Sequence, residues 1–124
     1  MARAQTARVF GEMNATRTVL EICLQNNHFA LGQDQGECSV GYACSTLVEG
    51  AKQDASASCA AGSGVPQLPD PLTTRSAITA TFSAAAAAPL QGKTMIMRRK
   101  ADGSWLCDGA AASAPAKYLP SACR

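Results

Sequence analysis

Hydrophobic positions in the first part of the chain recur with the period of an α-helix. Apolar or weakly polar side chains return at steps of three and four, and the set comprises Val9, Met13, Thr16, Leu20 and Cys23, flanked by Phe10 and Leu24. Proline is absent from this stretch, and Asn26 and Asn27 follow it as residues that can end a helix. The pattern predicts one amphipathic helix over residues 2–27.

Two later stretches alternate with the period of a β-strand instead. Residues 76–82 and 92–98 each place apolar side chains at every second position, which predicts two half-buried strands. The pair Asp102-Gly103 predicts a tight turn, after which residues 104–107 return as a third strand. The alanines at 84–88 are expected to form a loop, because so short a helix is marginal. An antiparallel meander is therefore expected over residues 76–108.

The segment between helix and strands, residues 28–75, is rich in glycine and proline and has the composition of a loop-rich connector. Within it, Ser45 to Lys52 is a candidate short helix. The whole chain, residues 1–124, is long enough for one core and too short for two. The predicted fold class is α+β, in which a long N-terminal helix packs on an antiparallel sheet.

Cysteine usage adds covalent constraints to this picture. The six cysteines are even in number, and no pair has the two-residue spacing of a zinc knuckle or a thioredoxin-like redox site. They predict three disulfides formed in an oxidising compartment, although the sequence leaves 15 pairings open. Proximity along the chain favours Cys23 with Cys38, Cys44 with Cys59, and Cys107 with Cys123.

Catalytic chemistry has no candidate in the sequence. His28 is the only histidine, and neither a Gly-x-Ser-x-Gly elbow nor a phosphate-binding loop is present. With the cysteines assigned to disulfides, few ligands remain for a metal ion. We therefore expect a protein that is not an enzyme and carries no metal or cofactor. The net charge of +2 does not by itself indicate a nucleic-acid or membrane partner.

Several local strings resemble the type IV pilins, and in particular the type IVa subgroup. Residues 2–5 and 19–24 are similar to the family's N-terminal helix, and residues 64–74 are similar to its lead into the sheet. The most diagnostic strings are Gly103-Ser104-Trp105-Leu106-Cys107 and Lys117-Tyr118-Leu119-Pro120 before Cys123. They look like the two ends of the family's C-terminal disulfide-bounded region.

The resemblance implies the pilin fold, with residues 2–27 as the C-terminal half of a longer spine helix and residues 107–123 as a disulfide-bounded loop. It implies an N-terminally truncated, soluble domain. The absent apolar half-helix would anchor the subunit in the inner membrane before assembly and pack in the centre of the fibre afterwards. The pair Cys44 and Cys59 looks additional to the family's usual pattern.

The implied function is that of a major pilin, a structural subunit that polymerises with copies of itself into an extracellular fimbrium. Adhesion to host or abiotic surfaces and twitching motility follow from the resemblance, with phage attachment or DNA uptake as further functions. Lys117 and Tyr118 combine a cation with an amphipathic ring, as interfaces often do. The alternatives without a binding function are a C-terminal loop whose disulfide only stabilises the end of the chain, and a Tyr118 side chain that packs onto Trp105.

The basic run Arg98-Arg99-Lys100 lies next to the predicted turn, so we expect these side chains to project into water as a solvated hairpin end. The functional hypothesis is that these residues contact DNA. Because the site would be repeated along a fibre, many weak contacts would together give stronger binding. Two competing functions remain open. One is a minor pilin or a secretion pseudopilin, some of which use a calcium loop instead of the C-terminal disulfide. The other is a free secreted binding or inhibitor module stapled by disulfides.

Overall fold

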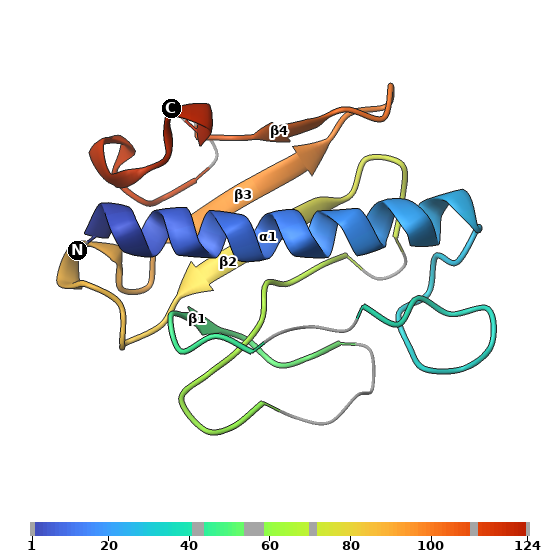
Figure 1. The fold of residues 1–124 in the computed structure, drawn as a ribbon, viewed down its shortest axis with the longest axis horizontal. Coiled ribbons are helices and arrows are strands. Elements are labelled where there is room, and N and C mark those ends of the chain that lie inside the picture. Colours follow the sequence, from blue (N-terminus) through green and yellow to red (C-terminus); the bar gives the residue numbers. More distant parts are fainter. Residues whose placement is uncertain (1, 41–43, 54–58, 70–71, 110–111, 124) are drawn as a thin grey trace.

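The computed structural model describes residues 2–40, 44–53, 59–69, 72–109 and 112–123. In these residues one long helix lies against a four-stranded antiparallel sheet of order β1-β2-β3-β4 (Figure 1). The elements are α1 (Ala2–Gln25), β1 (Val48–Glu49), β2 (Ala77–Phe82), β3 (Thr94–Arg99) and β4 (Trp105–Cys107), with short 3-10 helices at Ala88–Leu90, Ala116–Tyr118 and Ser121–Cys123. The predicted α+β class is confirmed.

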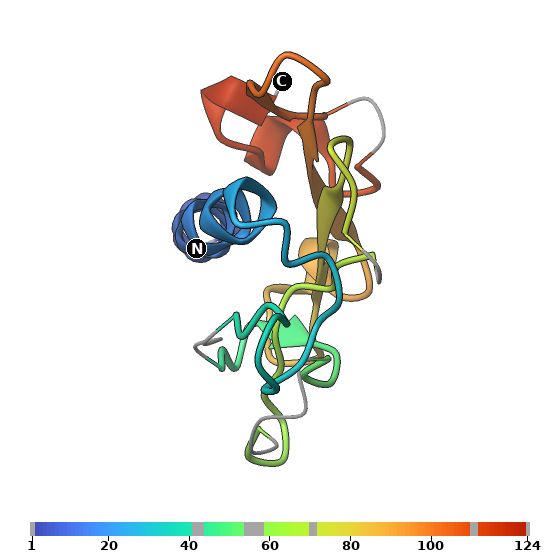
Figure 2. The same ribbon diagram turned by 90° about the vertical axis from the view of Figure 1, so that its right-hand side faces the viewer.

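Helix α1 covers one face of the sheet, and the core lies between them (Figure 2). The predicted helix stripe is buried as a whole, with Val9, Met13 and Leu20 at 0% exposure. From the sheet, β2 buries every second residue, and Phe82 is 1% exposed. Apolar side chains that recur every three or four residues in α1 thus pack against side chains that recur every second residue in β2, and together they form one apolar layer.

The asparagine residues after α1 explain where this helix ends. The helix stops at Gln25, two residues before the predicted limit, and Asn27 adopts a left-handed conformation with φ of 58°. The amide of His28 then donates to the carbonyl oxygen of Cys23 at 2.9 Å, which satisfies one of the last helical carbonyls. Asparagine tolerates this conformation better than most residues.

The predicted short helix from Ser45 to Lys52 is wrong. Val48 and Glu49 form β1, and Val48 pairs with Phe82 of β2. Ser45 forms an isolated antiparallel bridge with Gly64, where a Cβ atom would lie 2.6 Å from the amide nitrogen of Gly50. Glycine at this position lets two backbones approach closely, so the segment pairs as extended chain and the sheet gains a fourth strand.

The other strands lie close to their predicted positions. Strand β2 begins one residue later than expected, and β3 runs from Thr94 to Arg99 because Gly92, with φ of 73°, belongs to the preceding turn. The loop predicted at residues 84–88 is observed at residues 84–87, and Ala88 begins the 3-10 helix Ala88–Leu90. Strands β2 and β3 pair in register from Ala77 with Arg98 to Thr81 with Thr94.

Candidate interaction surfaces

The cysteines are joined in near-neighbour pairs, which fixes the connector and the tail. The Cα atoms are 5.6 Å apart in Cys23–Cys38, 5.8 Å in Cys44–Cys59 and 4.7 Å in Cys107–Cys123. Cys23 and Cys38 are 6% and 0% exposed, so this pair belongs to the core at the end of α1. Cys44 is exposed at the surface.

The C-terminal loop, residues 107–123, is bound to the start of α1. Nε of Arg3 donates to the carbonyl oxygen of Lys117 at 3.0 Å, and Oγ1 of Thr6 donates to the carbonyl oxygen of Tyr118. The Nζ atom of Lys117 lies 5.0 Å from the centre of the Tyr118 ring, within cation–π range. Lys117 is exposed and Tyr118 is half-buried. The two predicted binding residues therefore lie together on a loop that the helix holds in place.

The basic run does not project as one cluster, contrary to expectation. Arg98 pairs with Asp108, with Nε 2.8 Å from Oδ2, and its side chain is 49% exposed. Arg99 is only 13% exposed and pairs with Glu21 of α1. Successive residues of a strand point to opposite faces, so Arg98 and Arg99 diverge. Of the three, Lys100 lies beyond β3 in the turn and is exposed.

Glu21 lies at the centre of a polar junction between the helix and the sheet. Its Oε1 accepts hydrogen bonds from Nε of Arg99 at 2.5 Å and from Nε1 of Trp105 at 2.7 Å, and Nη1 of Arg99 donates to the carbonyl oxygen of Thr74 at 2.7 Å. The hydrogen bond from Arg99, and then that from Trp105, lowers the pKa of Glu21 below its usual 4.5, against partial burial that raises it. Arg17, four residues before Glu21 on the same helix, contributes only a weaker electrostatic effect on this pKa.

The outer face of α1 is exposed and carries small side chains. Its exposed positions include the small residues Ala4, Gly11, Ala15 and Thr18, the large residue Ile22, and Arg8, which pairs with Glu12. Ile22 is 55% exposed although it is a large apolar residue. A helix face of this kind permits the close approach of another backbone.

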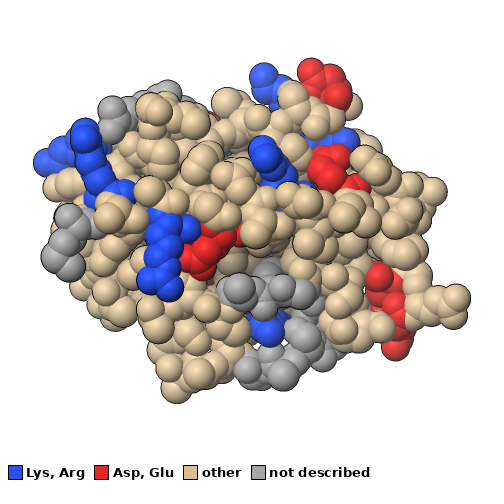
Figure 3. All heavy atoms as spheres, in the orientation of Figure 1, with Lys and Arg blue, Asp and Glu red and all other residues tan. Residues whose placement is uncertain are grey.

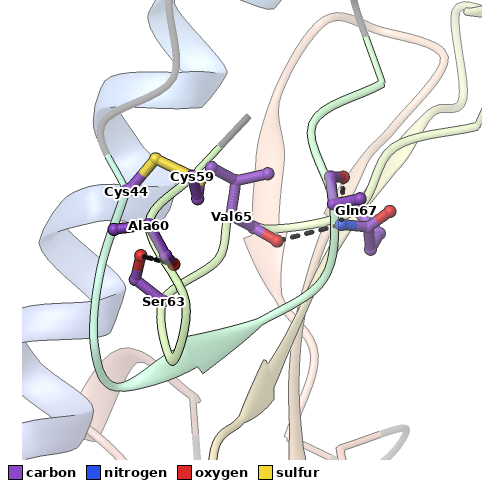
Figure 4. Close-up of a disulfide and its surroundings, with 7 residues drawn as sticks. Cys44, Cys59, Ala60, Ser63, Val65 and Gln67 are labelled. Carbon is purple, nitrogen blue, oxygen red and sulfur yellow. Dashed lines mark hydrogen bonds between the residues drawn. A yellow bond between two sulfur atoms is a disulfide. The ribbon is translucent and has the colours of Figure 1, made fainter. Parts of the chain in front are cut away.

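The disulfide Cys44–Cys59 lies beside the segment of residues 60–67 (Figure 4). Oγ of Ser63 donates to the carbonyl oxygen of Ala60 at 2.7 Å, and Nε2 of Gln67 donates to the carbonyl oxygen of Val65 at 3.0 Å. A depression of about 340 Å³ beside the disulfide is lined by small residues and Lys52. Both hydrogen bonds join a side chain to a backbone carbonyl within residues 60–67, which follow the disulfide.

Neither a metal site nor a membrane span is found in the part of the chain that the structure describes. Its Asp, Glu, His and Cys residues form no group of three or more suited to hold a metal ion. Over the same residues, no helix combines the length and the apolar character needed to cross a bilayer.

Comparison with known proteins identifies the family. The family model for pilin, a bacterial filament protein, matches residues 2–124. The chain belongs to the pilin family. This pilin is therefore a structural protein and not an enzyme.

Its relatives include both major and minor fimbrial proteins of Dichelobacter nodosus. A probable minor fimbrial protein is 39% identical over 124 residues, covering 100% of this chain and 76% of the relative. A second protein with that description is 38% identical with the same coverage. A type IV major fimbrial protein, FimA, is 31% identical over 128 residues, covering 100% of this pilin and 77% of FimA.

Sequence reasoning missed the junction of Glu21, Arg99 and Trp105. The three residues were visible individually, but the hydrogen bond from Arg99 spans 78 positions and that from Trp105 spans 84. The only available signal was strand alternation, which makes one of two adjacent arginines face the helix.

Proposed function

We propose that this pilin is a subunit of a type IV pilus and polymerises through the exposed face of α1. The observation that supports this most directly is the row of small residues on that face, with Ile22 exposed at its end. Small side chains let neighbouring helices approach closely, and a head-to-tail contact of this kind produces an open helical filament. The 31% identity to a type IV major fimbrial protein supports the same assembly.

The test uses the full-length protein in its source bacterium. A Cβ atom added at Gly11 would meet nothing within 4 Å, and Ala15 is exposed, so Gly11→Arg with Ala15→Arg leaves the subunit folded. We expect the protein to be made but to disappear from filaments sheared off the cells, as seen by mass spectrometry and electron microscopy. Ala101→Arg, in the exposed turn between β3 and β4, is the control and should assemble. Normal assembly of the double variant would overturn the proposal.

The same proposal places the subunit in the inner membrane before assembly, held by an apolar segment that continues α1 upstream. The resemblance to the family supports it, as does the first turn of α1, which has no acidic residue and contains Arg3. Sequencing the upstream codons and fractionating cells that lack the assembly machinery tests it. A cleavable signal peptide followed by a free periplasmic domain would contradict it, and would instead favour a secreted module.

A second candidate function is that of a minor pilus subunit. It is favoured by the identities of 39% and 38% to probable minor fimbrial proteins, against 31% for FimA. Deletion of the gene separates the two candidates. Loss of filaments indicates the major subunit, whereas filaments that persist, and that contain only traces of the protein in the parent strain, indicate a minor one.

We further propose that the assembled filament contacts host or abiotic surfaces through Lys117 and Tyr118, and that it serves adhesion and twitching motility. The exposed position of Lys117 supports this assignment. Phage attachment and DNA contact stay predictions. The basis for DNA contact through residues 98–100 is weaker, since Arg98 and Arg99 are engaged in ion pairs. Filaments with Lys117→Ser should form normally and adhere less; unchanged adhesion would remove this residue from the contact.

A further inference from the structure

We propose that the end of the molecule where α1 begins is a contact surface for anionic phospholipid headgroups. The surface is defined by Arg3, Lys93 and Lys117, hereafter the basic end. This inference rests on the proposed function, because an apolar continuation of α1 would leave the domain through this end and bring it against the bilayer. It adds a partner, the lipid headgroup, that the filament itself does not require.

Three segments distant in the sequence meet at the basic end. The first turns of α1 bond to the C-terminal loop through the contact from Arg3 to Lys117. On the other side, Oε1 of Gln5 accepts a hydrogen bond from the amide of Ala87 at 2.7 Å, which joins α1 to the segment that leads to Lys93. Arg3, Lys93 and Lys117 are all exposed. The first turns of α1 are thus bonded to the loop that carries Lys117 and to the segment that precedes Lys93.

Basic side chains predominate in three described stretches near this end, and Glu12, just beyond the first of them, pairs with Arg8. The stretches 2–11, 83–95 and 112–123 contain no Asp or Glu. The ion pairs among described residues involve Arg8, Arg98 and Arg99, and none involves a member of the basic end. Figure 3, in the orientation of Figure 1, shows Lys and Arg near the start of α1 with one acidic patch beside them.

Near the far end of α1, acidic and basic side chains are mixed, as in the ion pair of Glu21 with Arg99. Residues 26–40 carry Asp34 and Glu37 and no Lys or Arg. An anionic surface therefore attracts one end of the long axis and repels the loop at the other. The net charge of +2 is a sum over the whole chain and does not reveal this difference in charge between the two ends.

The chemistry of the basic end favours a lipid surface over a nucleic acid. Tyr118 lies beneath Lys117 in a cation–π contact, and an amphipathic ring next to a long cationic side chain is typical of the boundary between headgroups and water. The cations lie on three separate segments at one end of the domain, whereas a nucleic-acid site needs a groove or stripe that follows a backbone. Duplex DNA is kept as an outcome of the test.

The experiment measures binding of the chain to vesicles made of equal parts phosphatidylglycerol and phosphatidylethanolamine. We expect binding at low ionic strength that weakens as salt is added, and none to vesicles of phosphatidylethanolamine and phosphatidylcholine. Each basic residue near an anionic membrane contributes roughly fivefold, so Arg3→Gln, Lys93→Gln and Lys117→Gln together should reduce binding roughly a hundredfold.

Two further variants separate position from total charge and from misfolding. Lys52→Gln, Arg75→Gln and Lys100→Gln together remove the same charge away from the basic end and should bind nearly as the parent does. Arg3→Lys, Lys93→Arg and Lys117→Arg together keep the charge and should also bind. The inference is overturned by absent vesicle binding, by equal loss in the two neutralised variants, or by tighter binding to duplex DNA than to vesicles.

Failure of the inference and failure of the proposed function give different results. If filaments incorporate the full-length parent but the chain ignores anionic vesicles, the lipid contact is wrong and the pilus assignment stands. If the full-length gene encodes no apolar segment before α1, the pilus assignment fails, and vesicle binding would then lose its proposed role.

Discussion

Glu21 of α1 is the charged residue whose hydrogen bonds join the helix to the sheet. One carboxylate oxygen receives a guanidinium from β3 and an indole N–H from β4, so a single side chain orients two strands against α1. Hydrogen bonds to a charged group each contribute about 1.5 to 3 kcal/mol, more than an exposed ion pair. Its side chain is 26% exposed, which places the junction at the edge of the core.

The lowered pKa of Glu21 predicts a dependence of stability on pH. The ionised form is favoured in the folded state, so its contribution is present above the ordinary value of 4.5 and is lost as the pH falls through the lower folded pKa. Glu21→Gln should lower the free energy of unfolding by about 2 kcal/mol at neutral pH. Urea titrations from neutral to acidic pH should show the difference from the parent shrinking below that range.

The matched control for Glu21 is Glu49→Gln, at the exposed end of β1. It should change the free energy of unfolding by less than about 0.5 kcal/mol at every pH. An equal and pH-independent loss in both variants would show that Glu21 acts by packing and not by charge.

Residues whose role depends on local spacing were predictable, and those whose role depends on a distant partner were not. Val9, Met13 and Leu20 follow from helix periodicity alone, and all three are buried. Arg99 looked like part of a solvated run, because nothing near it in the sequence indicates Glu21. Its inward position is set by tertiary structure.

The elements show how the C-terminal loop is held. Thr6 is fully buried in α1, and its hydroxyl donates to the carbonyl oxygen of Tyr118 in the 3-10 helix Ala116–Tyr118. The same hydroxyl also lies 2.9 Å from the carbonyl oxygen of Arg3. A partly buried carbonyl that loses its donor costs free energy, so this contact links the order of the loop to the helix.

Thr6→Val should therefore loosen the loop without unfolding the domain. Valine has the same shape and removes only the hydroxyl, and we expect a loss of about 1 to 2 kcal/mol. Hydrogen exchange should accelerate at Tyr118 and Leu119, whose amides bond within the loop. Thr18→Val, at an exposed position of the same helix, is the control and should leave exchange there unchanged. Equal exchange in the two variants would contradict the contact.

The disulfides differ in exposure, which predicts their order of reduction. Cys44 is exposed, whereas Cys38 and Cys123 are 0% and 1% exposed. Limited treatment with a thiol reductant, followed by alkylation and peptide mapping, should label Cys44 and Cys59 first. Prior labelling of Cys107 and Cys123 would show that the C-terminal loop opens more readily than its contacts with α1 indicate.

Element prediction succeeded where the pattern was long. Helix α1 and strands β2 and β3 each repeat their period over six or more residues, and their predicted positions are correct within two residues. Strand β1 has only two residues, too few to show alternation, and it forms because Phe82 and Gly64 provide partners for residues 45–49. The sequence pattern did not predict β1 because this strand depends on pairing with residues that are distant in the sequence.

At the scale of the whole molecule, the two proposed contact surfaces lie at different positions relative to α1. The small-residue face of the helix is proposed for subunit packing, and the basic end is proposed for the membrane before assembly. Lys117 belongs to the basic end and to the C-terminal loop, so one residue would serve first a lipid surface and later an external one. This succession requires Lys117 to stay accessible in the filament.

Amine labelling tests that requirement across the molecule. Lys117, on the C-terminal loop, should react with an acylating reagent in sheared filaments about as fast as in the free chain. We expect the connector, residues 28–75, to meet neighbouring subunits together with the outer face of α1, so Lys52 should become protected on assembly. Because both rates are compared with the free chain, the half-buried state of Lys52 does not bias the comparison. Protection of Lys117 with a reactive Lys52 would mean that the subunit is turned the other way in the fibre, with its C-terminal loop between subunits and its connector outside.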